Sequence, residues 1–185
     1  MPTTLHLSLA EYDSMVSVGA FDRFPRKVEL IRGELIQMNP AGPLHDHLIT
    51  YLTNWSVRNS NPKQTQITSQ TGLSLPGQVS RSEPDLMWLR LASFRDHHPM
   101  ASDVQLAIEV AYSSLAYDLE EKRLLYAEAG IAENWIVDAE ANCIHVLTHP
   151  EQSDYTKRQV FKVGEIITPS FAPNAMLSLR DLFEG

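Results

Sequence analysis

One stretch, residues 105–114 (QLAIEVAYSS), constrains the fold most, because it is apolar enough for a buried strand yet carries an acid in its centre. Side chains alternate between the two faces of a strand, so Glu109 projects between Ala107 and Ala111. The apolar side chains of the opposite face are Leu106, Ile108, Val110 and Tyr112. Burying an ionised carboxylate costs several kcal/mol unless a cation or several donors compensate for it. The stretch therefore predicts a central strand whose acid faces a cleft and a cation.

Strand and helix patterns are mixed along the rest of the chain. Ser8 and Glu11 form a capping box that opens a helix ending near Gly19, and Pro43 opens a second helix. Further helices are expected over residues 115–129, before Gly130, and over 178–183. Strands are expected at 27–31, 34–38, 65–69, 72–76, 84–90, 104–112, 134–138, 143–149 and 155–163. This order predicts one α/β domain over residues 1–185, with a mixed central sheet flanked by helices and an N-terminal helix and hairpin.

Charge and cysteine content limit the function classes. The net charge of −8 argues against non-specific nucleic-acid binding through a basic face, but it is compatible with a nuclease whose carboxylates bind metal. No apolar stretch is long enough for a membrane span, so we expect a cytoplasmic protein. The single cysteine, Cys143, excludes an internal disulfide. It shares a strand face with His145, and we interpret the two as an inert pair.

Two further charged residues interrupt apolar patterns. Asp85 follows Pro84 at the entrance of a strand, and carboxylates on paired strands about 4.8 Å apart can share one divalent cation. Lys122 falls on the apolar stripe of the helix over 115–129, directly after the strand that carries Glu109. Asp118 is its i,i+4 partner, in a position to orient it. We therefore expect Asp85, Glu109 and Lys122 to converge.

Each of these residues has a structural alternative. An aspartate at a strand start is often a turn or capping residue, Lys122 can reach water along its alkyl stem, and Glu109 can belong to a structural ion pair. Together, however, they supply what metal-assisted phosphodiester hydrolysis needs. Carboxylates hold Mg²⁺, the metal activates water and stabilises the pentavalent phosphate, and a lysine orients the nucleophile or neutralises charge.

The order of these residues resembles the PD-(D/E)XK nuclease superfamily, which has the restriction-endonuclease-like fold. More narrowly, the chain resembles the Uma-two family of restriction-endonuclease-like proteins. The matching segments are VELIRGELIQMNPAGPLHDH, EPDLMWL, AIEVAYSS and DLEEKRLLYAEAGIAENWIVD. The resemblance implies that Asp85 and Glu109 are metal ligands, assisted by the carbonyl of Val110.

The chain departs from the superfamily pattern at Ala111, where a lysine is expected two residues after the glutamate. The Uma-two family commonly has its lysine in the next helix, and Lys122 fits that position. The resemblance also implies an acid from an early element, for which Glu34 is the candidate, and a histidine matching His45. Alternation along residues 34–38 makes an inward-facing Glu34 plausible.

The leading hypothesis is therefore a Mg²⁺- or Mn²⁺-dependent endonuclease that cuts DNA and acts as a homodimer. The alternative is a non-catalytic interaction module on the same fold, which binds a structural ion or a partner. The acidic net charge and Ala111 favour this alternative. A third option is a metal-dependent hydrolase of another phosphate or ester.

Overall fold

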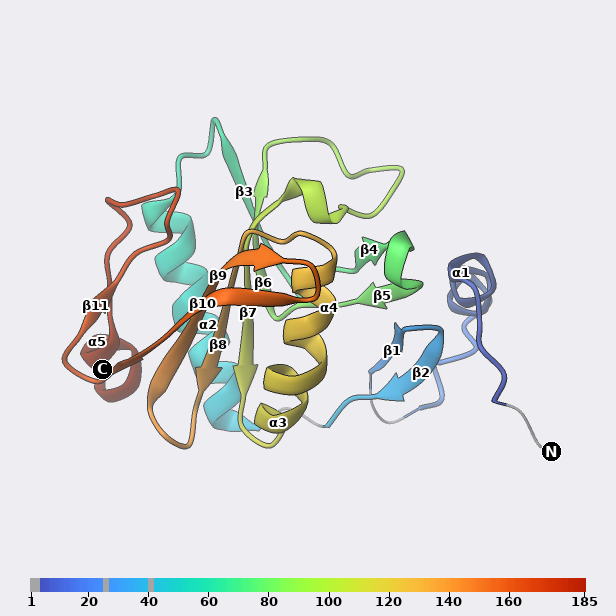
Figure 1. Cartoon of the computed structure of the whole chain (residues 1–185), viewed down its shortest axis with the longest axis horizontal. Helices are drawn as coiled ribbons and strands as arrows, with labels where there is room; N and C mark the ends of the chain where they lie inside the picture. The colour runs from blue at the N-terminus through green and yellow to red at the C-terminus, as the bar shows by residue number, and fades with distance from the viewer. Residues whose placement is uncertain (1–3, 25–26, 40–41) are drawn as a thin grey trace.

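The computed structural model describes residues 4–24, 27–39 and 42–185 and is built around a six-stranded mixed sheet (Figure 1). The strand order is β10-β9-β8-β7-β6-β3, and only β7 and β8 run parallel. The strands are β3 (Thr65–Ser69), β6 (Leu86–Arg90), β7 (Val104–Ala111), β8 (Glu133–Asp138), β9 (Cys143–Glu151) and β10 (Asp154–Lys162). The crossover from β7 to β8 is the helical segment that carries Lys122.

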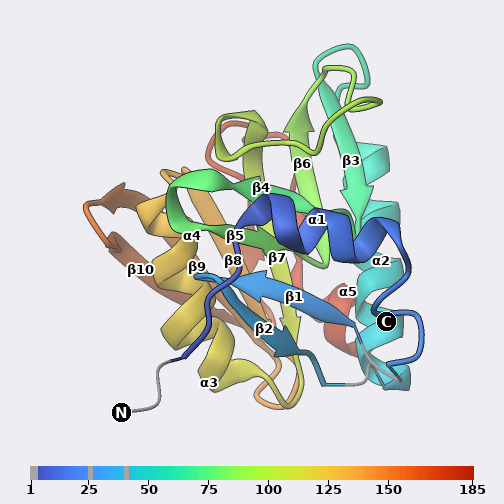
Figure 2. The ribbon, with the colours of Figure 1, turned by 90° about the vertical axis from the view of Figure 1, so that its right-hand side faces the viewer.

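A smaller antiparallel sheet, of order β2-β1-β5-β4, lies beside the large one (Figures 1 and 2). Its strands are β1 (Val28–Ile31), β2 (Glu34–Gln37), β4 (Leu73–Leu75) and β5 (Ser80–Ser82). The predicted hairpin is confirmed: its two turn residues, Arg32 and Gly33, have φ values of 51° and 81°. Positive φ at both central residues suits the tight turn that joins two twisted strands. The sequence patterns did not predict that these four strands form a sheet of their own.

Helices cover both faces of the six-stranded sheet. On one face, α2 (Pro43–Asn59) and α5 (Leu179–Glu184) pack on the apolar side chains of β7, including Leu106, Ile108 and Val110. On the other face, α4 (Arg123–Glu128) packs on Ala107, Ala111 and their neighbours. The predicted division of β7 into two faces is therefore confirmed, as is the mixed sheet flanked by helices. The N-terminal helix α1 (Leu9–Ser17) begins at the expected capping box of Ser8 and Glu11.

The helix predicted over residues 115–129 is interrupted by a wider turn. It comprises α3 (Leu115–Tyr117), a π-helical turn η3 (Asp118–Lys122) and α4. A π turn adds one residue to the repeat and changes the direction of the side chains that follow it, and such turns are frequent at functional sites. Lys122, the last residue of this turn, is buried against the sheet as predicted.

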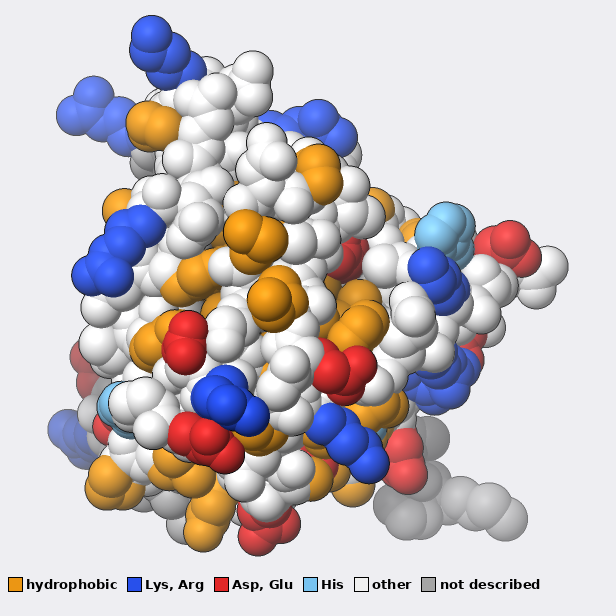
Figure 3. Space-filling model, turned by 90° about the vertical axis from the view of Figure 1, so that its left-hand side faces the viewer, with side chains coloured by type: hydrophobic (Ala, Val, Ile, Leu, Met, Phe, Trp, Pro, Cys, Tyr) orange, Lys and Arg blue, Asp and Glu red, His pale blue; other side chains and the backbone are white. Residues whose placement is uncertain are grey.

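Short elements complete the chain. Two 3₁₀ turns, η1 (Pro76–Gln78) and η2 (Ala101–Asp103), precede β5 and β7, and β11 (Ile166–Ile167) pairs with β12 (Leu177–Ser178) before α5. The face shown in Figure 3 carries exposed hydrophobic side chains interspersed with acidic and basic ones, with no broad basic patch. Within the described residues, no helix is long and apolar enough to cross a membrane.

Candidate active site

A cavity of about 340 Å³ lies between the small sheet, the start of β6, the end of β7 and the N-terminus of α2. Most of the residues that line it are polar or charged. The lining includes Lys27, Glu29, Asn39, His45, Gln70, Glu83, Asp85, Glu109, Val110, Ser113, Ser114, Asp118 and Lys122. Of the six residues predicted for the site, five line this cavity and Glu34 does not.

Asp85 is held at the strand entrance by two groups from other elements. Its Oδ2 accepts a hydrogen bond of 2.8 Å from the Val110 amide, which connects β6 to β7 beside Glu109. The same oxygen lies 3.4 Å from Nε2 of His45, in the first turn of α2. Burial alone would raise the pKa of Asp85, but His45, Lys122 and the Val110 amide outweigh it and lower that pKa. Asp85 is therefore an anion at neutral pH.

His45 responds to the same contact. The hydrogen bond to Asp85 raises the pKa of His45 and outweighs burial, which lowers it. Its Nδ1 lies 3.6 Å from the carboxylate of Asp46. The imidazole is thus held between two carboxylates, and protonated His45 places a positive charge at the mouth of the cavity.

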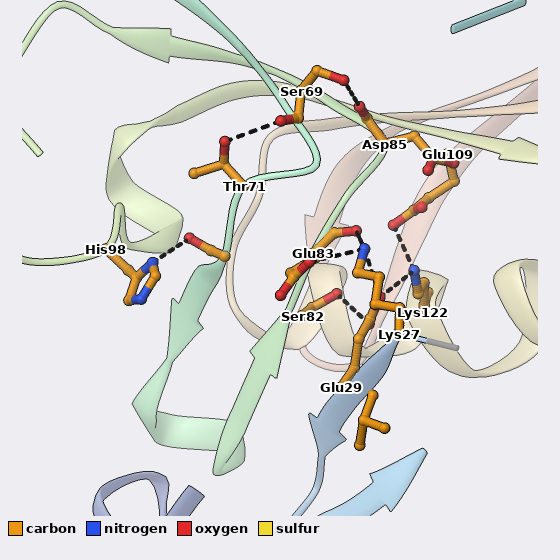
Figure 4. A network of polar contacts seen from close by, with 12 residues as sticks. Lys27, Glu29, Ser69, Thr71, Ser82, Glu83, Asp85, His98, Glu109 and Lys122 are labelled. Carbon is orange, nitrogen blue, oxygen red and sulfur yellow. Dashed lines mark hydrogen bonds and ion pairs between the residues drawn. The ribbon is translucent and has the colours of Figure 1, made fainter. Parts of the chain in front are cut away.

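Glu109 lines the cavity, as expected of a cleft-facing side chain, but it is buried, at 2% exposure. Its Oε1 lies 3.1 Å from Nζ of Lys122 (Figure 4). The same oxygen accepts a hydrogen bond of 2.5 Å from the hydroxyl of Tyr126. The side chain is buried because α4 and the small sheet cover this face of β7. Burial raises the pKa of Glu109 to about 8, Lys122 opposes that rise, and the neighbouring acids add to it.

Lys122 is also buried, at 2% exposure, and it contacts a second acid, Glu29, with Nζ 3.6 Å from its Oε1. Desolvation would lower the pKa of Lys122, but Glu109 and Glu29 outweigh it and hold that pKa well above its usual value. Lys122 is therefore a cation. Asp118 lies in the same cavity but makes no ion pair with Lys122 within the described residues, because its carboxylate accepts from Ser114 Oγ at 2.6 Å.

Glu29 is the site residue that sequence analysis missed. It lies on β1 and is fully buried, with Oε1 3.3 Å from Nζ of Lys27 and Oε2 accepting from Ser82 Oγ. Figure 4 shows Glu29, Lys27, Lys122 and Glu109 directed toward one another. The signal was present in the sequence, because Glu29 interrupts the apolar strand VELI in the way that Glu109 interrupts its own strand.

Glu34, the early acid expected in the site, lies outside it. Its side chain is 52% exposed and 4.0 Å from the ring of His6. The register puts Glu34 on the same sheet face as Glu29, because Ile31 pairs with Glu34 and Glu29 pairs with Ile36, but Glu34 lies at the turn end of the edge strand β2 and does not reach the cavity. The acid that reaches the cavity from this hairpin therefore comes from β1.

Ion pairs of one arginine connect the β1–β2 hairpin to the helix that follows β7. Arg32 donates to both carboxylate oxygens of Glu128, at 2.8 and 2.9 Å, and to Glu121 at 2.6 Å. Glu121 and Glu128 lie on the outer side of the helix that carries Lys122. Arg32 thereby fixes the distance between the strand of Glu29 and the helix of Lys122.

The donor set fits a small divalent cation of the Mg²⁺ class. Among the described residues, the contacts of Asp85 fall on Oδ2 and those of Glu109 on Oε1, which leaves Oδ1 and Oε2 for a cation. Within the part of the chain that is described, no three acids or histidines of this cavity have ligand atoms within 4.8 Å of one another. The protein thus offers two carboxylates rather than a closed cage, and Mg²⁺ usually keeps several waters beside one or two carboxylates.

Comparison with known proteins is consistent with this arrangement. A family model described as "Putative restriction endonuclease", Uma2, matches residues 10–180. A crystal structure from Anabaena variabilis ATCC 29413, described as a "putative nuclease belonging to DUF820", superposes with a TM-score of 0.74 at 17% identity. The alignment covers 96% of this chain and 98% of that one, so the two share their fold. No curated protein matches the sequence. Because the family model spans most of the chain, this protein belongs to the Uma2 family of restriction-endonuclease-like proteins.

Proposed function

We propose that the protein is a Mg²⁺- or Mn²⁺-dependent endonuclease that hydrolyses DNA phosphodiester bonds in the cavity between β6, β7 and β1. One observation carries the proposal. Two carboxylates from adjacent strands, Asp85 and Glu109, are linked through the Val110 amide, and a buried lysine from the next helix contacts the second of them. Membership of the Uma2 family and the fold shared with a protein described as a nuclease support the same class of reaction.

Asp85 and Glu109 would hold the cation through Oδ1 and Oε2, with the Val110 carbonyl as a further ligand. A divalent cation in such a site supplies a more acidic water and stabilises negative charge on phosphate oxygens. Burial raises the pKa of Glu109 to about 8, and a bound cation would stabilise the ionised form of this side chain. The cation thus compensates a carboxylate that is otherwise held by Lys122 and Tyr126.

The remaining charged groups would act on the phosphate and on protons. Lys122 carries a fixed positive charge beside Glu109 and would orient the attacking oxygen or neutralise the phosphate. Protonated His45, 3.4 Å from Asp85, would present an N–H at the entrance of the cavity. Glu29 would keep Lys122 ionised and directed at Glu109, which makes it a positioning residue.

The test is cleavage of supercoiled and linear DNA in Mg²⁺, in Mn²⁺ and in EDTA. We expect cleavage only with metal, and a loss of about 100- to 1000-fold in Lys122→Gln, with at least as large a loss in Glu109→Gln. Glu34→Gln is the matched control, because it removes an acid of the same type that is exposed and outside the cavity. Full activity of folded Glu109→Gln and Lys122→Gln would refute the proposal.

One observation favours a second function, a non-catalytic interaction module on the same fold. Lys122 already pairs with Glu109 and Glu29 in a closed buried network, which can be purely structural. Calorimetric titration with Mn²⁺ separates the two functions. The nuclease requires Mn²⁺ binding that Asp85→Asn and Glu109→Gln weaken, whereas a structural network predicts no heat of binding and only a change in stability.

The homodimer stays a prediction. Cleavage of both strands of a duplex needs two active sites, and twofold dimers are the commonest oligomers. Light scattering of the purified chain, alone and with a DNA duplex, measures the number of subunits directly.

A further inference from the structure

A second group of metal-ligating side chains lies at the turn between β8 and β9. Asp138 ends β8, and Cys143 and His145 begin β9, with Asp138 and Cys143 directly paired across the hairpin. One ligand atom from each of the three lies within 4.8 Å of the other two, and within the described residues no other group of three meets that limit. Asp138 and Cys143 are buried and His145 is half-buried, so the group is not a solvated acidic patch.

We propose that Asp138, Cys143 and His145 form a binding site for a thiophilic divalent cation of the Zn²⁺ class. A sulfur, an imidazole nitrogen and a carboxylate oxygen form a donor set that suits Zn²⁺ and is poorly suited to Mg²⁺. With ordinary zinc bond lengths, the sulfur and nitrogen of a tetrahedral site lie about 3.6 Å apart. Sγ of Cys143 lies 3.9 Å from Nε2 of His145, so a small side-chain movement closes the site.

The Asp138 carboxylate is oriented in a way that leaves one oxygen for the ion. Oδ1 accepts hydrogen bonds from the amides of Glu140 and Ala141, at 3.0 and 2.9 Å, as part of the turn. Among the described residues, Oδ2 has no hydrogen bond. Carboxylates that bind metals are commonly hydrogen-bonded in this way, which fixes their orientation. A water would complete the fourth position.

The alternative, that Cys143 and His145 are an inert pair, accounts for Oδ1 of Asp138 through the turn but gives no role to Oδ2. A cation would bind a carboxylate oxygen of Asp138 together with Sγ of Cys143 and a ring nitrogen of His145, which lie close to one another. On binding, the S–H bond of Cys143 breaks, its proton passes to the buffer, and the thiolate binds the metal.

This site is separate from the candidate active site but lies on the same face of the large sheet. Ile136 of β8 is paired with Glu109 on one side and with His145 on the other, so His145 lies two strands from Glu109, and Asp138 lies at the end of the strand between them. Two strand spacings amount to about 10 Å. A bound ion would fasten the β8–β9 turn beside the strand that carries Glu109, which is a structural role and needs no part in the reaction.

Cobalt titration of the untagged protein tests the site, because a thiolate bound to Co²⁺ gives a charge-transfer absorption that oxygen ligands do not. Cys143 is the only cysteine of the chain, so the band has one possible source. We expect one Co²⁺ bound per chain through the thiolate, displaced by Zn²⁺, and a band absent in Cys143→Ser and retained in Glu109→Gln.

His145→Gln and Asp138→Asn should weaken Co²⁺ binding by at least the roughly 10- to 100-fold that loss of an outer-layer partner costs. His149→Gln is the matched control, because His149 lies on the same hairpin and is exposed, and its ring hydrogen-bonds only Thr148 among the described residues. Absence of the band in the wild-type protein would overturn the proposal, whatever the folding of the variants. So would equal affinities in the wild type, His145→Gln and Asp138→Asn.

Discussion

Replacement of Lys122 by methionine should destabilise the protein strongly, because it removes the cation from a buried cluster of acids. The ammonium group lies 3.1 Å from Glu109 and 3.6 Å from Glu29, and both carboxylates are buried. Methionine fills a similar volume without the charge. The substitution therefore leaves two buried carboxylates whose remaining partners are Tyr126, Lys27 and Ser82.

Removal of one partner from a buried ion pair typically costs about 3 to 5 kcal/mol. For a domain of this size, each kcal/mol lowers Tm by roughly 2 to 4 °C, so a fall of about 6 to 20 °C is expected. The cost should depend on pH. With Lys122 present the pKa of Glu109 is already raised to about 8, and without Lys122 it rises further, so from about pH 8 upward the folded variant keeps a proton that the folded wild type releases. The destabilisation relative to the wild type therefore grows as pH rises through about 8.

Urea unfolding in EDTA at about pH 7 and pH 9, on either side of the wild-type pKa of Glu109, measures both effects. Lys27→Met is the matched control, because Lys27 also contacts Glu29 but is 30% exposed, and exposed pairs contribute about 1 kcal/mol or less. The double variant Glu109→Gln/Lys122→Met should recover part of the loss. A structural role for the Lys122 charge is refuted if Lys122→Met lowers the free energy of unfolding no more than Lys27→Met does, or lowers it equally at both pH values.

Three further outcomes follow from the site. Tyr126→Phe removes the hydroxyl that donates to Glu109, so the free energy of unfolding should fall by about 1 to 3 kcal/mol in urea titration; an unchanged value would contradict the 2.5 Å hydrogen bond. Mn²⁺ affinity should rise about tenfold per pH unit from pH 6 to 8, because binding of the ion displaces the proton of Glu109. Calorimetry in two buffers measures both the affinity and the release of one proton. An affinity that does not change with pH would argue against Glu109 as a ligand. Arg32→Met should lower the free energy of unfolding by only about 1 kcal/mol, since Arg32 is 38% exposed. It should nevertheless lower DNA cleavage more than Glu34→Gln does, because the hairpin that carries Glu29 loses its ion pairs to the helix of Lys122.

The residues of the large sheet were predictable because their signals are local. Alternation along β7 separated the face of Glu109 from the apolar face, and the helical stripe turned Lys122 inward. The capping box of α1 and the turn at Arg32–Gly33 depend on a few neighbouring residues and also followed from the sequence. Pro84 placed Asp85 at the entrance of a strand, and the mixed α/β fold is confirmed.

The features that the sequence did not predict depend on pairing between strands that are distant in the chain. The choice between Glu29 and Glu34 turns on which strand of the hairpin pairs with β5, a three-residue strand that carries no clear pattern of its own. That pairing makes β1 central and leaves β2 at the edge. The burial of Glu109 was likewise missed, because a single strand does not reveal that a helix and a second sheet cover the same face.

The central claim is that the acids at the ends of β6 and β7 hold a catalytic divalent cation. Anomalous diffraction from a crystal soaked in Mn²⁺ measures this most directly. We expect a Mn²⁺ peak about 2.0 to 2.3 Å from carboxylate oxygens of both Asp85 and Glu109, with the Val110 carbonyl in the same coordination shell. A crystal with Mn²⁺ bound elsewhere, or with none while Glu109 keeps its contacts to Lys122 and Tyr126, would contradict it.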